Sequence, residues 1–218
     1  MSDLLIVFVK APRPGLVKTR LAAAIGAEHA AALYRAMAER VFRETDPASG
    51  TYARVVCYAP ADGGREVDAW LPAERLHVQS AGDLGARMAA AFEWAFDGGA
   101  ARVVLIGTDT PDLSRGDVLH AFESLRTSDL VVGPSLDGGY YLIGLPRPIP
   151  ALFERIPWST PAVLGETLNR AESLGLRAAP LAVKADIDTL EDVRRNWTWM
   201  REWVPTTLVQ ALDATLSD

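Results

Sequence analysis

The apolar run Val103–Ile106 constrains the fold more than any other stretch of the chain. It contains only valine, leucine and isoleucine, and Gly107 follows it directly. A short apolar run without polar alternation, bounded by glycine and proline, is typical of a strand buried on both faces of a parallel sheet. We therefore expect a sheet whose strands alternate with helices along the chain.

The rest of the sequence shows this alternation. We predict strands at 4–9, 53–59, 76–79, 103–106, 130–133, 140–145 and 179–183. We predict helices from Val17 into the following alanines, before Leu71, and at 27–45, 84–96, 115–126, 162–174 and 190–203. This order predicts a three-layer α/β/α fold with a mainly parallel sheet. The length of 218 residues fits a single domain over 1–218, because α/β domains commonly exceed about 200 residues.

Charge and composition exclude several classes of protein. The formal net charge of -6 argues against a nucleic-acid partner, which favours a basic stripe. The apolar run Leu4–Val9 is too short to cross a membrane, and Asp3 precedes it where a signal peptide carries positive charge. The single cysteine, Cys57, has no partner for an internal disulfide. We expect it to be a small core residue in a reduced, cytoplasmic protein.

The segment after the first predicted strand gathers positive charge in an acidic chain. Its basic residues are Lys10, Arg13, Lys18 and Arg20, and the stretch 10–20 contains no acidic residue. A cationic loop that leads into a helix is suited to bind an anion such as phosphate. The alternative is a solvated surface loop. A P-loop is excluded, because Val17 precedes Lys18 and the glycine spacing is missing.

Carboxylates follow two of the predicted strands. Asp109 comes just after the strand 103–106, where the ligand crevice of an open α/β sheet lies. There a carboxylate can hold a hard cation against a phosphate, although a turn or helix cap is the alternative. Asp186 and Asp188 project to one face of an extended segment, so one can ligate a cation while the other orients a neighbouring group. We assign Asp112 to the start of the following helix.

Two glycine turns complete the set of candidate site residues. Gly82 and Gly85 flank Asp83 and would let backbone approach a nucleobase or ribose closely. The alternative is ordinary capping of the next helix. The second turn, 137–139, is either a simple hairpin turn or a turn that faces the same crevice and admits an acceptor.

Five stretches together resemble the GT-A (nucleotide-diphospho-sugar transferase) fold, over nearly the whole chain. They are 9–21, 82–88, 107–113, 133–140 and 186–192. The match is closest to a bacterial family of GT-A-like proteins often labelled arsenosugar-biosynthesis glycosyltransferases. The same stretches resemble those of 2-phospholactate guanylyltransferases and molybdenum-cofactor nucleotidyltransferases. The resemblance implies a Rossmann-like fold with a mainly parallel, mixed sheet.

The resemblance also implies roles for individual residues. In the nucleotidyltransferases the first loop holds a triphosphate, a role that falls here to Lys18 and Arg20. A carboxylate after the central strand and a late Asp-Ile-Asp share Mg²⁺ there, which implies Asp109 and Asp188 as ligands of Mg²⁺ or Mn²⁺, with Asp186 beside them. One departure bears on triphosphate specificity: the signature Leu-Ala-Gly-Gly-x-Gly-x-Arg is replaced by a loop with a single glycine at 11–15.

Two reactions fit these residues. In glycosyl transfer from a nucleotide sugar to a small acceptor, the acceptor hydroxyl must lose a proton, and Asp137 is the best candidate base. In nucleotidyl transfer from a triphosphate, an anionic acceptor attacks phosphorus and pyrophosphate leaves, so no strong base is needed. We favour glycosyl transfer. A non-catalytic nucleotide-binding module is the third interpretation.

The predicted site therefore has two parts. The catalytic residues are Lys18, Arg20, Asp109 and Asp137. The predicted nucleotide contacts are Lys10, Arg13, Lys18, Arg20, Gly82, Asp83, Gly85, Arg87, Gly138 and Gly139. The tryptophans at 197, 199 and 203 are compatible with internal packing or with a contact between two copies in a homodimer.

Overall fold

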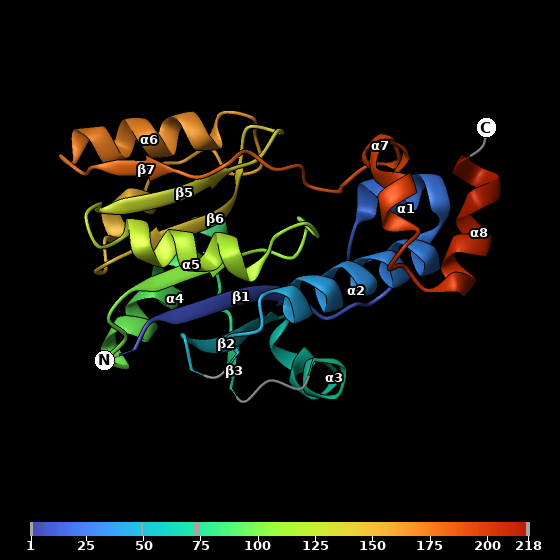
Figure 1. Cartoon of the computed structure of the whole chain (residues 1–218), viewed down its shortest axis with the longest axis horizontal. Helices are drawn as coiled ribbons and strands as arrows, with labels where there is room; N and C mark the ends of the chain where they lie inside the picture. The colour runs from blue at the N-terminus through green and yellow to red at the C-terminus, as the bar shows by residue number, and fades with distance from the viewer. Residues whose placement is uncertain (1, 49, 72–74, 217–218) are drawn as a thin grey trace.

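A seven-stranded sheet forms the centre of the structure, a computed structural model that describes residues 2–48, 50–71 and 75–216. The strands are β1 (Leu4–Lys10), β2 (Ala53–Ala59), β3 (Leu76–Val78), β4 (Val103–Ile106), β5 (Leu130–Pro134), β6 (Tyr140–Leu145) and β7 (Ala178–Pro180). Their order is β3-β2-β1-β4-β6-β5-β7 (Figure 1). Among the strands of the described residues, only β6 runs antiparallel to its neighbours, β4 and β5. The predicted mainly parallel, mixed sheet is confirmed.

The helices also lie close to their predicted positions. They are α1 (Thr19–Ile25), α2 (Ala27–Glu44), α3 (Gly64–Trp70), α4 (Leu84–Asp97), α5 (Arg115–Ser124), α6 (Val163–Ser173), α7 (Leu190–Met200) and α8 (Thr206–Leu216), with the 3-10 helices η1 (Ala61–Gly63) and η2 (Pro150–Phe153). The first helix begins two residues later than predicted. The last predicted helix ends at Met200, and α8, which the sequence analysis did not identify, follows it. None of these helices has both the length and the apolar character needed to cross a bilayer.

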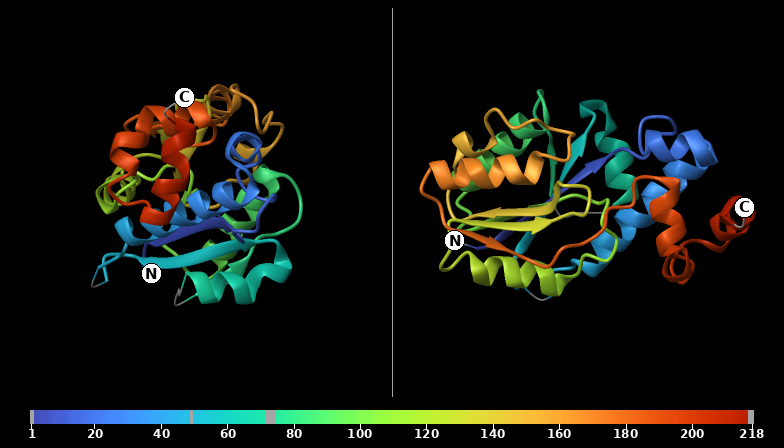
Figure 2. Two further views of the ribbon diagram at one scale, coloured as in Figure 1. Left: turned by 90° about the vertical axis from the view of Figure 1, so that its right-hand side faces the viewer. Right: turned by 90° about the horizontal axis from the view of Figure 1, so that it is seen from above.

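Alternation along the strands produces the three layers. In β1, Leu5 and Val7 point to one face of the sheet, where α2, α3 and α5 pack. Leu4 and Ile6 point to the other face, which α4, η2 and α6 cover (Figure 2). Successive side chains of a strand project to opposite faces, so an unbroken apolar strand requires helices on both sides. Cys57 is buried in the second of these layers, as predicted.

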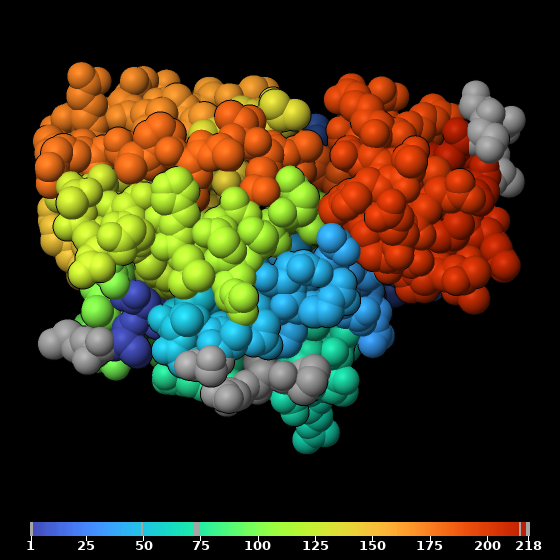
Figure 3. Space-filling view, in the orientation of Figure 1, coloured from blue at the N-terminus to red at the C-terminus, as the bar shows by residue number. Residues whose placement is uncertain are grey.

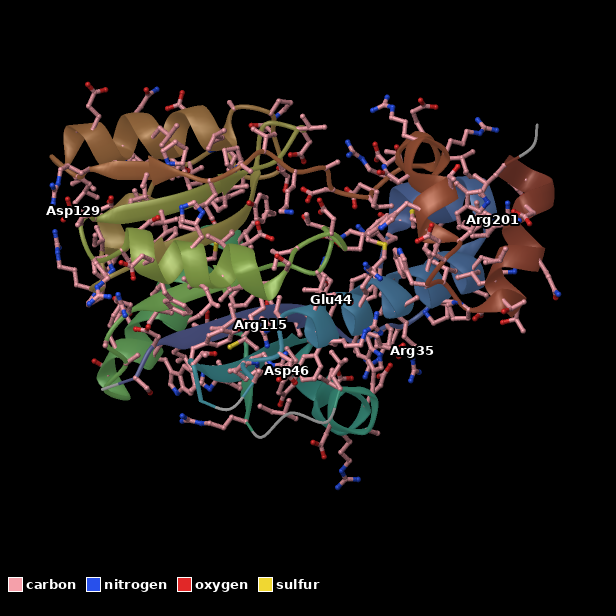
Figure 4. The ribbon with its side chains drawn as sticks, in the orientation of Figure 1. Arg35, Glu44, Asp46, Arg115, Asp129 and Arg201 are labelled. Carbon is pink, nitrogen blue, oxygen red and sulfur yellow. The ribbon has the colours of Figure 1, made fainter. Side chains whose placement is uncertain are left out.

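A separate helical lobe extends from one end of the sheet. It comprises α1, α7, α8 and one face of α2 around Leu33, Met37, Trp197 and Leu212 (Figures 1 and 3). Figure 4 marks Arg201 in this lobe and Asp129 at the far end of the molecule. Trp197 is buried in this lobe, and Trp199 and Trp203 pack against it. Because α2 packs against both the sheet and the lobe, it connects the two.

The strand directions bring four loops to one edge of the sheet. β1 and β4 are parallel neighbours, although β2 and β3 lie on the other side of β1. β5 is antiparallel to β6, which is antiparallel to β4, so β5 and its parallel partner β7 also end at this edge. The segments 11–18, 107–113, 135–139 and 181–188 therefore begin side by side. This is the crevice position expected of an open α/β sheet.

Truncation of a β1 core side chain provides a test of this architecture. Leu5 is fully buried, whereas Leu136 is 72% exposed. We expect Leu5→Ala to lower the free energy of unfolding by about 2–5 kcal/mol, because it leaves a cavity in the central strand. Leu136→Ala is the matched control and should change it by less than about 0.5 kcal/mol. Urea denaturation of both variants measures the difference, and equal losses would contradict the assignment of β1 to the core.

Candidate active site

The ammonium group of Lys18 lies between two carboxylates at this edge. Its Nζ is 2.6 Å from Oδ1 of Asp109 and 2.7 Å from Oδ1 of Asp188. It also donates a hydrogen bond of 2.5 Å to the carbonyl oxygen of Ile187. The side chain is only 3% exposed. Three oxygens thus match the three N–H donors of an ammonium group, and Lys18 joins the loop after β1 to the segments after β4 and β7.

Local packing holds Lys18 in this position. Ala11 and Val17, which flank most of the loop, are buried in the core on the α2 side of the sheet. Lys18 itself has φ 47° and ψ 45° and directly precedes α1. This left-handed conformation is uncommon for a residue other than glycine, and it persists where the surroundings fix it. The fold therefore holds the Lys18 backbone in an uncommon conformation beside the carboxylates.

The electrostatic environment keeps this lysine charged. Burial acts to lower the pKa of Lys18, but the charges of Asp109 and Asp188 and their hydrogen bonds to the ammonium group outweigh that effect. The pKa consequently lies above its ordinary value. The backbone supports the same arrangement, because the N–H of Ile187 donates to the carbonyl oxygen of Asp109 at 2.8 Å. The two carboxylate segments thus form one unit.

Asp186, the third candidate ligand, is partly buried beside Thr110. It accepts a hydrogen bond from the Thr110 hydroxyl. Burial is the main cause that raises the pKa of Asp186 to about 6, and the charges of Asp109 and Asp137 add to it. The Thr110 hydrogen bond and the charge of Lys18 act in the opposite direction. Asp109 and Asp137 are therefore close enough to Asp186 to affect its pKa.

The 137–139 turn is a hairpin turn and also belongs to this edge. It connects β5 to β6, which confirms the hairpin interpretation. Oδ1 of Asp137 accepts hydrogen bonds from the Ser135 hydroxyl and from the Gly139 N–H. Gly138 has φ 88°, and a Cβ there would lie 2.2 Å from the carbonyl oxygen of Pro161. Only glycine fits this approach, so the turn is held tightly against the segment before α6.

Polar groups of the 82–87 turn form hydrogen bonds within the turn itself. Asp83 caps α4 by accepting a hydrogen bond of 2.9 Å from the Ala86 N–H, which confirms the capping interpretation. Arg87 donates to the carbonyl oxygen of Gly82 at 2.9 Å. A Cβ on Gly85 would lie 2.5 Å from Nε1 of Trp158. Trp158 was not singled out by sequence reasoning, because nothing in its local pattern indicates contact with a turn so distant in the chain.

The four basic residues of the first loop separate in space. Arg20 is 76% exposed and lies 3.9 Å from Oδ2 of Asp188, so it stands beside Lys18. Arg13 instead pairs with Glu66 at 2.8 Å and with Asp62 at 3.2 Å. The Lys10 side chain is exposed, while its backbone N–H donates to the Tyr34 hydroxyl. In the structure, Lys18 and Arg20 therefore lie at Asp109 and Asp188, whereas Arg13 forms its ion pair with Glu66 of α3.

A second lysine, Lys184, was missed in the sequence. Its Nζ lies 3.2 Å from Oδ2 of Asp112 and 3.4 Å from Oδ2 of Asp117. The N-cap of α5 is Ser114, in a capping box with Asp117. Asp112 therefore precedes the cap, and Lys184 holds its carboxylate. The sequence did contain a signal for its position: Lys184 directly follows the predicted strand 179–183, so it was expected at the edge of the sheet where the carboxylates lie.

The helical lobe supports the loop after β4. Nε of Arg40, on α2, donates to the carbonyl oxygen of Pro111 at 3.0 Å. The guanidinium group lies 4.9 Å from the ring centre of Trp199 and 5.0 Å from that of Trp203, distances typical of cation–π contacts. These contacts give the tryptophans near the C-terminus an internal role.

A surface hollow of about 500 Å³ lies apart from the carboxylates, between the loop 11–18 and helices α2 and α3. Arg35, labelled in Figure 4, lines it together with Pro12, Pro14, Ala31 and Trp70. The hollow contains no residue of the Lys18 cluster. We place the candidate site at the carboxylates, because a convergence of buried charge is the better indicator of a functional site.

The donor set at the carboxylates suits a hard divalent cation, because such ions prefer carboxylate and carbonyl oxygens. The charged ammonium group shows that these oxygens already accommodate a cation. Within the described residues, no three histidine, cysteine or acidic side chains form a ready-made metal cluster. Any metal would therefore depend on Asp109 and Asp188, which are half-exposed, with Asp186 nearby.

Comparisons with known proteins agree with this fold. A bacterial family described as "Uncharacterized protein conserved in bacteria (DUF2064)" matches residues 44–160. A candidate nucleotide-diphospho-sugar transferase from Desulfovibrio desulfuricans G20 is 34% identical, with 100% of this chain and 98% of that chain covered and a TM-score of 0.88. No curated protein matches the sequence.

More distant solved structures share the fold alone. CMP:2-keto-3-deoxy-manno-octonic acid synthetase complexed with CTP is 13% identical, with 93% of this chain and 99% of that chain covered and a TM-score of 0.57. Rv0371c from Mycobacterium tuberculosis H37Rv, in complex with manganese, is 16% identical, with 89% and 97% covered and a TM-score of 0.56. The predicted GT-A (nucleotide-diphospho-sugar transferase) fold is confirmed.

A pair of glycine substitutions tests the tight 137–139 turn. Gly138→Ala places a methyl group against the Pro161 carbonyl in a left-handed backbone, so we expect a loss of at least about 1–3 kcal/mol in the free energy of unfolding. Gly165→Ala is the control: Gly165 lies in α6 with open space around its Cβ position. Gly165→Ala should raise the free energy of unfolding by about 0.5–1 kcal/mol, because alanine has a higher helix propensity than glycine. Chemical denaturation should give opposite signs, and two equal changes would contradict this geometry.

Proposed function

The chain belongs to the bacterial DUF2064 family, and we propose that it is a transferase that moves a glycosyl group from a nucleotide sugar to a small acceptor. The observation that carries the proposal is the convergence of Asp109, Asp188 and Lys18 at the carboxyl ends of β1 and β4. This is the place where open α/β sheets bind nucleotides. The 34% identity to a candidate nucleotide-diphospho-sugar transferase over the whole chain supports the same class of donor.

In this proposal the carboxylates hold Mg²⁺ or Mn²⁺. Asp109 and Asp188 would be the ligands, with Asp186 beside them. A divalent cation bound there would neutralise the negative charge that develops on the departing nucleoside diphosphate. The manganese complex of Rv0371c supports a metal on this fold.

The basic residues of the chain bind the phosphates of the donor. Arg20 is exposed beside Asp188, so its guanidinium group can reach a diphosphate that lies across the carboxylates. Lys18 supplies a second positive charge at the same point. Gly82, which is exposed, would receive the nucleoside, whereas Gly85 is buried against Trp158 and supports the turn from inside. The local hydrogen bonds of Asp83 and Arg87 hold the turn in shape.

Asp137 is the proposed base. The bond from the sugar carbon to the phosphate oxygen breaks, a bond from that carbon to the acceptor oxygen forms, and the acceptor proton moves to the Asp137 carboxylate. Both hydrogen bonds that Asp137 accepts within its turn go to Oδ1. They fix the carboxylate while Oδ2 takes part in neither bond. Gly139 places no side chain beside the Asp137 carboxylate, so an acceptor can approach there, whereas the space beside Gly138 is filled by the Pro161 backbone.

Nucleotidyl transfer is the second candidate. The structure of a synthetase complexed with CTP on the same fold favours it, as does the positive charge of Arg20 beside the carboxylates. In that reaction an anionic acceptor oxygen attacks the α-phosphorus of a triphosphate, the bond to the β-phosphate oxygen breaks, and pyrophosphate leaves. A base would then be unnecessary, and Asp137 would have no proton to accept.

A thermal-shift panel separates these candidates. Nucleotide sugars and nucleoside triphosphates are compared, each with and without Mn²⁺. A ligand at about 100 times its Kd adds about 2.7 kcal/mol, and each kcal/mol moves the Tm of a chain of this size by about 2–4 °C. We expect a metal-dependent shift with one nucleotide sugar. A shift with triphosphates alone would favour nucleotidyl transfer, and no shift with either class would contradict the site.

Two neighbouring aspartates provide a matched pair for the metal. Asp109→Asn should abolish the metal-dependent part of the shift and metal-dependent turnover, because a neutral amide is a poor metal ligand, while the fold is retained. Asp112→Asn lies on the same loop but faces Lys184, so it should leave both unchanged. Circular dichroism checks the fold of each variant. Wild-type turnover in Asp109→Asn would remove Asp109 from the mechanism, and persistent binding without turnover in the wild type would indicate a non-catalytic module.

The charge of Arg20 leads to a further expectation. Arg20→Gln should weaken nucleotide binding more at low salt than at high salt, because screening reduces the charge interaction in the wild type. Arg126→Gln is the control, since Arg126 is exposed at the end of α5 and pairs with Glu123. Calorimetric titration with the nucleotide found in the panel measures both. A loss that does not depend on salt would indicate a packing role for Arg20.

A further inference from the structure

We propose that Lys18 is an internal competitor of the metal: its ammonium group and a divalent cation exclude each other from Asp109 and Asp188. The competition requires only the contacts of the free protein. Its use in catalysis, in which the phosphates of the nucleotide draw Lys18 away as the metal enters, rests on the proposed function.

The contacts leave no place for both cations on the same atoms. The ammonium group lies 2.6 and 2.7 Å from the two Oδ1 atoms and 2.5 Å from the Ile187 carbonyl oxygen. A metal bound to the same Oδ1 atoms at about 2.0–2.6 Å would sit within a few ångströms of the Lys18 nitrogen. At that distance two positive ions repel strongly.

The two carboxylates nevertheless remain open to solvent on their outer side. Their side chains are 49% and 45% exposed, whereas Lys18 is almost completely buried. A metal can therefore reach the two Oδ1 atoms from the solvent side, and its binding to them requires the ammonium group to leave. Displacement needs only rotation of the flexible lysine side chain, since the backbone around Lys18 is anchored by its buried neighbours.

The charges show why nucleotide and metal would enter together. Two carboxylates and one ammonium group carry a net charge of about -1 at neutral pH. When a divalent cation replaces the ammonium group, the carboxylates are neutralised and Lys18 is left without an anionic partner. Arg20 lies 3.9 Å from Oδ2 of Asp188, so a phosphate held by Arg20 would lie where it can accept the released lysine. The exchange would then leave no charge unpaired.

Titration with Mn²⁺ alone tests the competition. The electron paramagnetic resonance signal of free Mn²⁺ measures the binding affinity of the full-length wild type and of Lys18→Met. We expect the variant to bind Mn²⁺ at least tenfold more tightly. Arg126→Met removes one positive charge far from the cluster and should bind as the wild type does, which controls for net charge. In the double variant Lys18→Met with Asp109→Asn the gain should disappear, because the metal then lacks a ligand.

A second variant guards against a folding defect. The glutamine side chain in Lys18→Gln is neutral and retains N–H donors for the Ile187 carbonyl. Circular dichroism and thermal melting show which of the Lys18 variants are folded. Mn²⁺ affinity that is unchanged or weaker in the folded Lys18 variants would overturn the proposal. A tenfold gain combined with no nucleotide-dependent thermal shift would sustain the competition while the proposed transferase function fails, so the two failures are distinguishable.

Discussion

The parallel pairing of β1 with β4 is the constraint on which the site depends. These strands are neighbours in the sheet, although the described residues between them in the chain form β2, β3, four α-helices and the 3-10 helix η1. Their register, with Leu4 opposite Val103 and Val7 opposite Ile106, brings both carboxyl ends to one level. The basic loop therefore begins beside the loop that carries Asp109. Without this pairing, nothing in the sheet would place the loop of Lys18 beside the loop of Asp109.

The ion cluster around Lys18 then joins three segments that are distant in the chain. Each contributes something the others lack: a cation from the first loop, a carboxylate from the loop after β4, and a carboxylate with a backbone carbonyl from the segment after β7. A buried ion pair is weak evidence for stability, since desolvation opposes its formation. Its position at a crevice agrees with the charged ligand that we propose for this site.

The helical lobe supports this arrangement through contacts on both carboxylate segments. Ile187 lies between the two late aspartates and is buried in the lobe with Val193 and Met200, so α7 positions Asp188 through its immediate neighbour. The capping box of Thr189 with Asp192 fixes where α7 begins. From the other side, Arg40 reaches the loop after β4. The lobe and the sheet thus hold the cluster from opposite directions, and α2 belongs to both.

Local chemistry in the sequence determined the elements and much of the site. Short β-branched runs indicate buried strands, and glycines and prolines end them. Acids and bases that follow the ends of parallel strands lie at one edge of the sheet, and this rule was sufficient to predict that Lys18, Arg20, Asp109 and Asp188 lie together there. Tertiary structure decided what each group contacts. Arg13 has the same charge as Lys18 and lies in the same loop, yet it pairs with α3, because side-chain partners depend on packing rather than on spacing in the chain. For the same reason only the folded structure shows that Lys184 pairs with Asp112 and that Trp158 packs against Gly85. It also shows the Lys18 ammonium group on Asp109 and Asp188, the two carboxylates that the sequence analysis assigned to a metal.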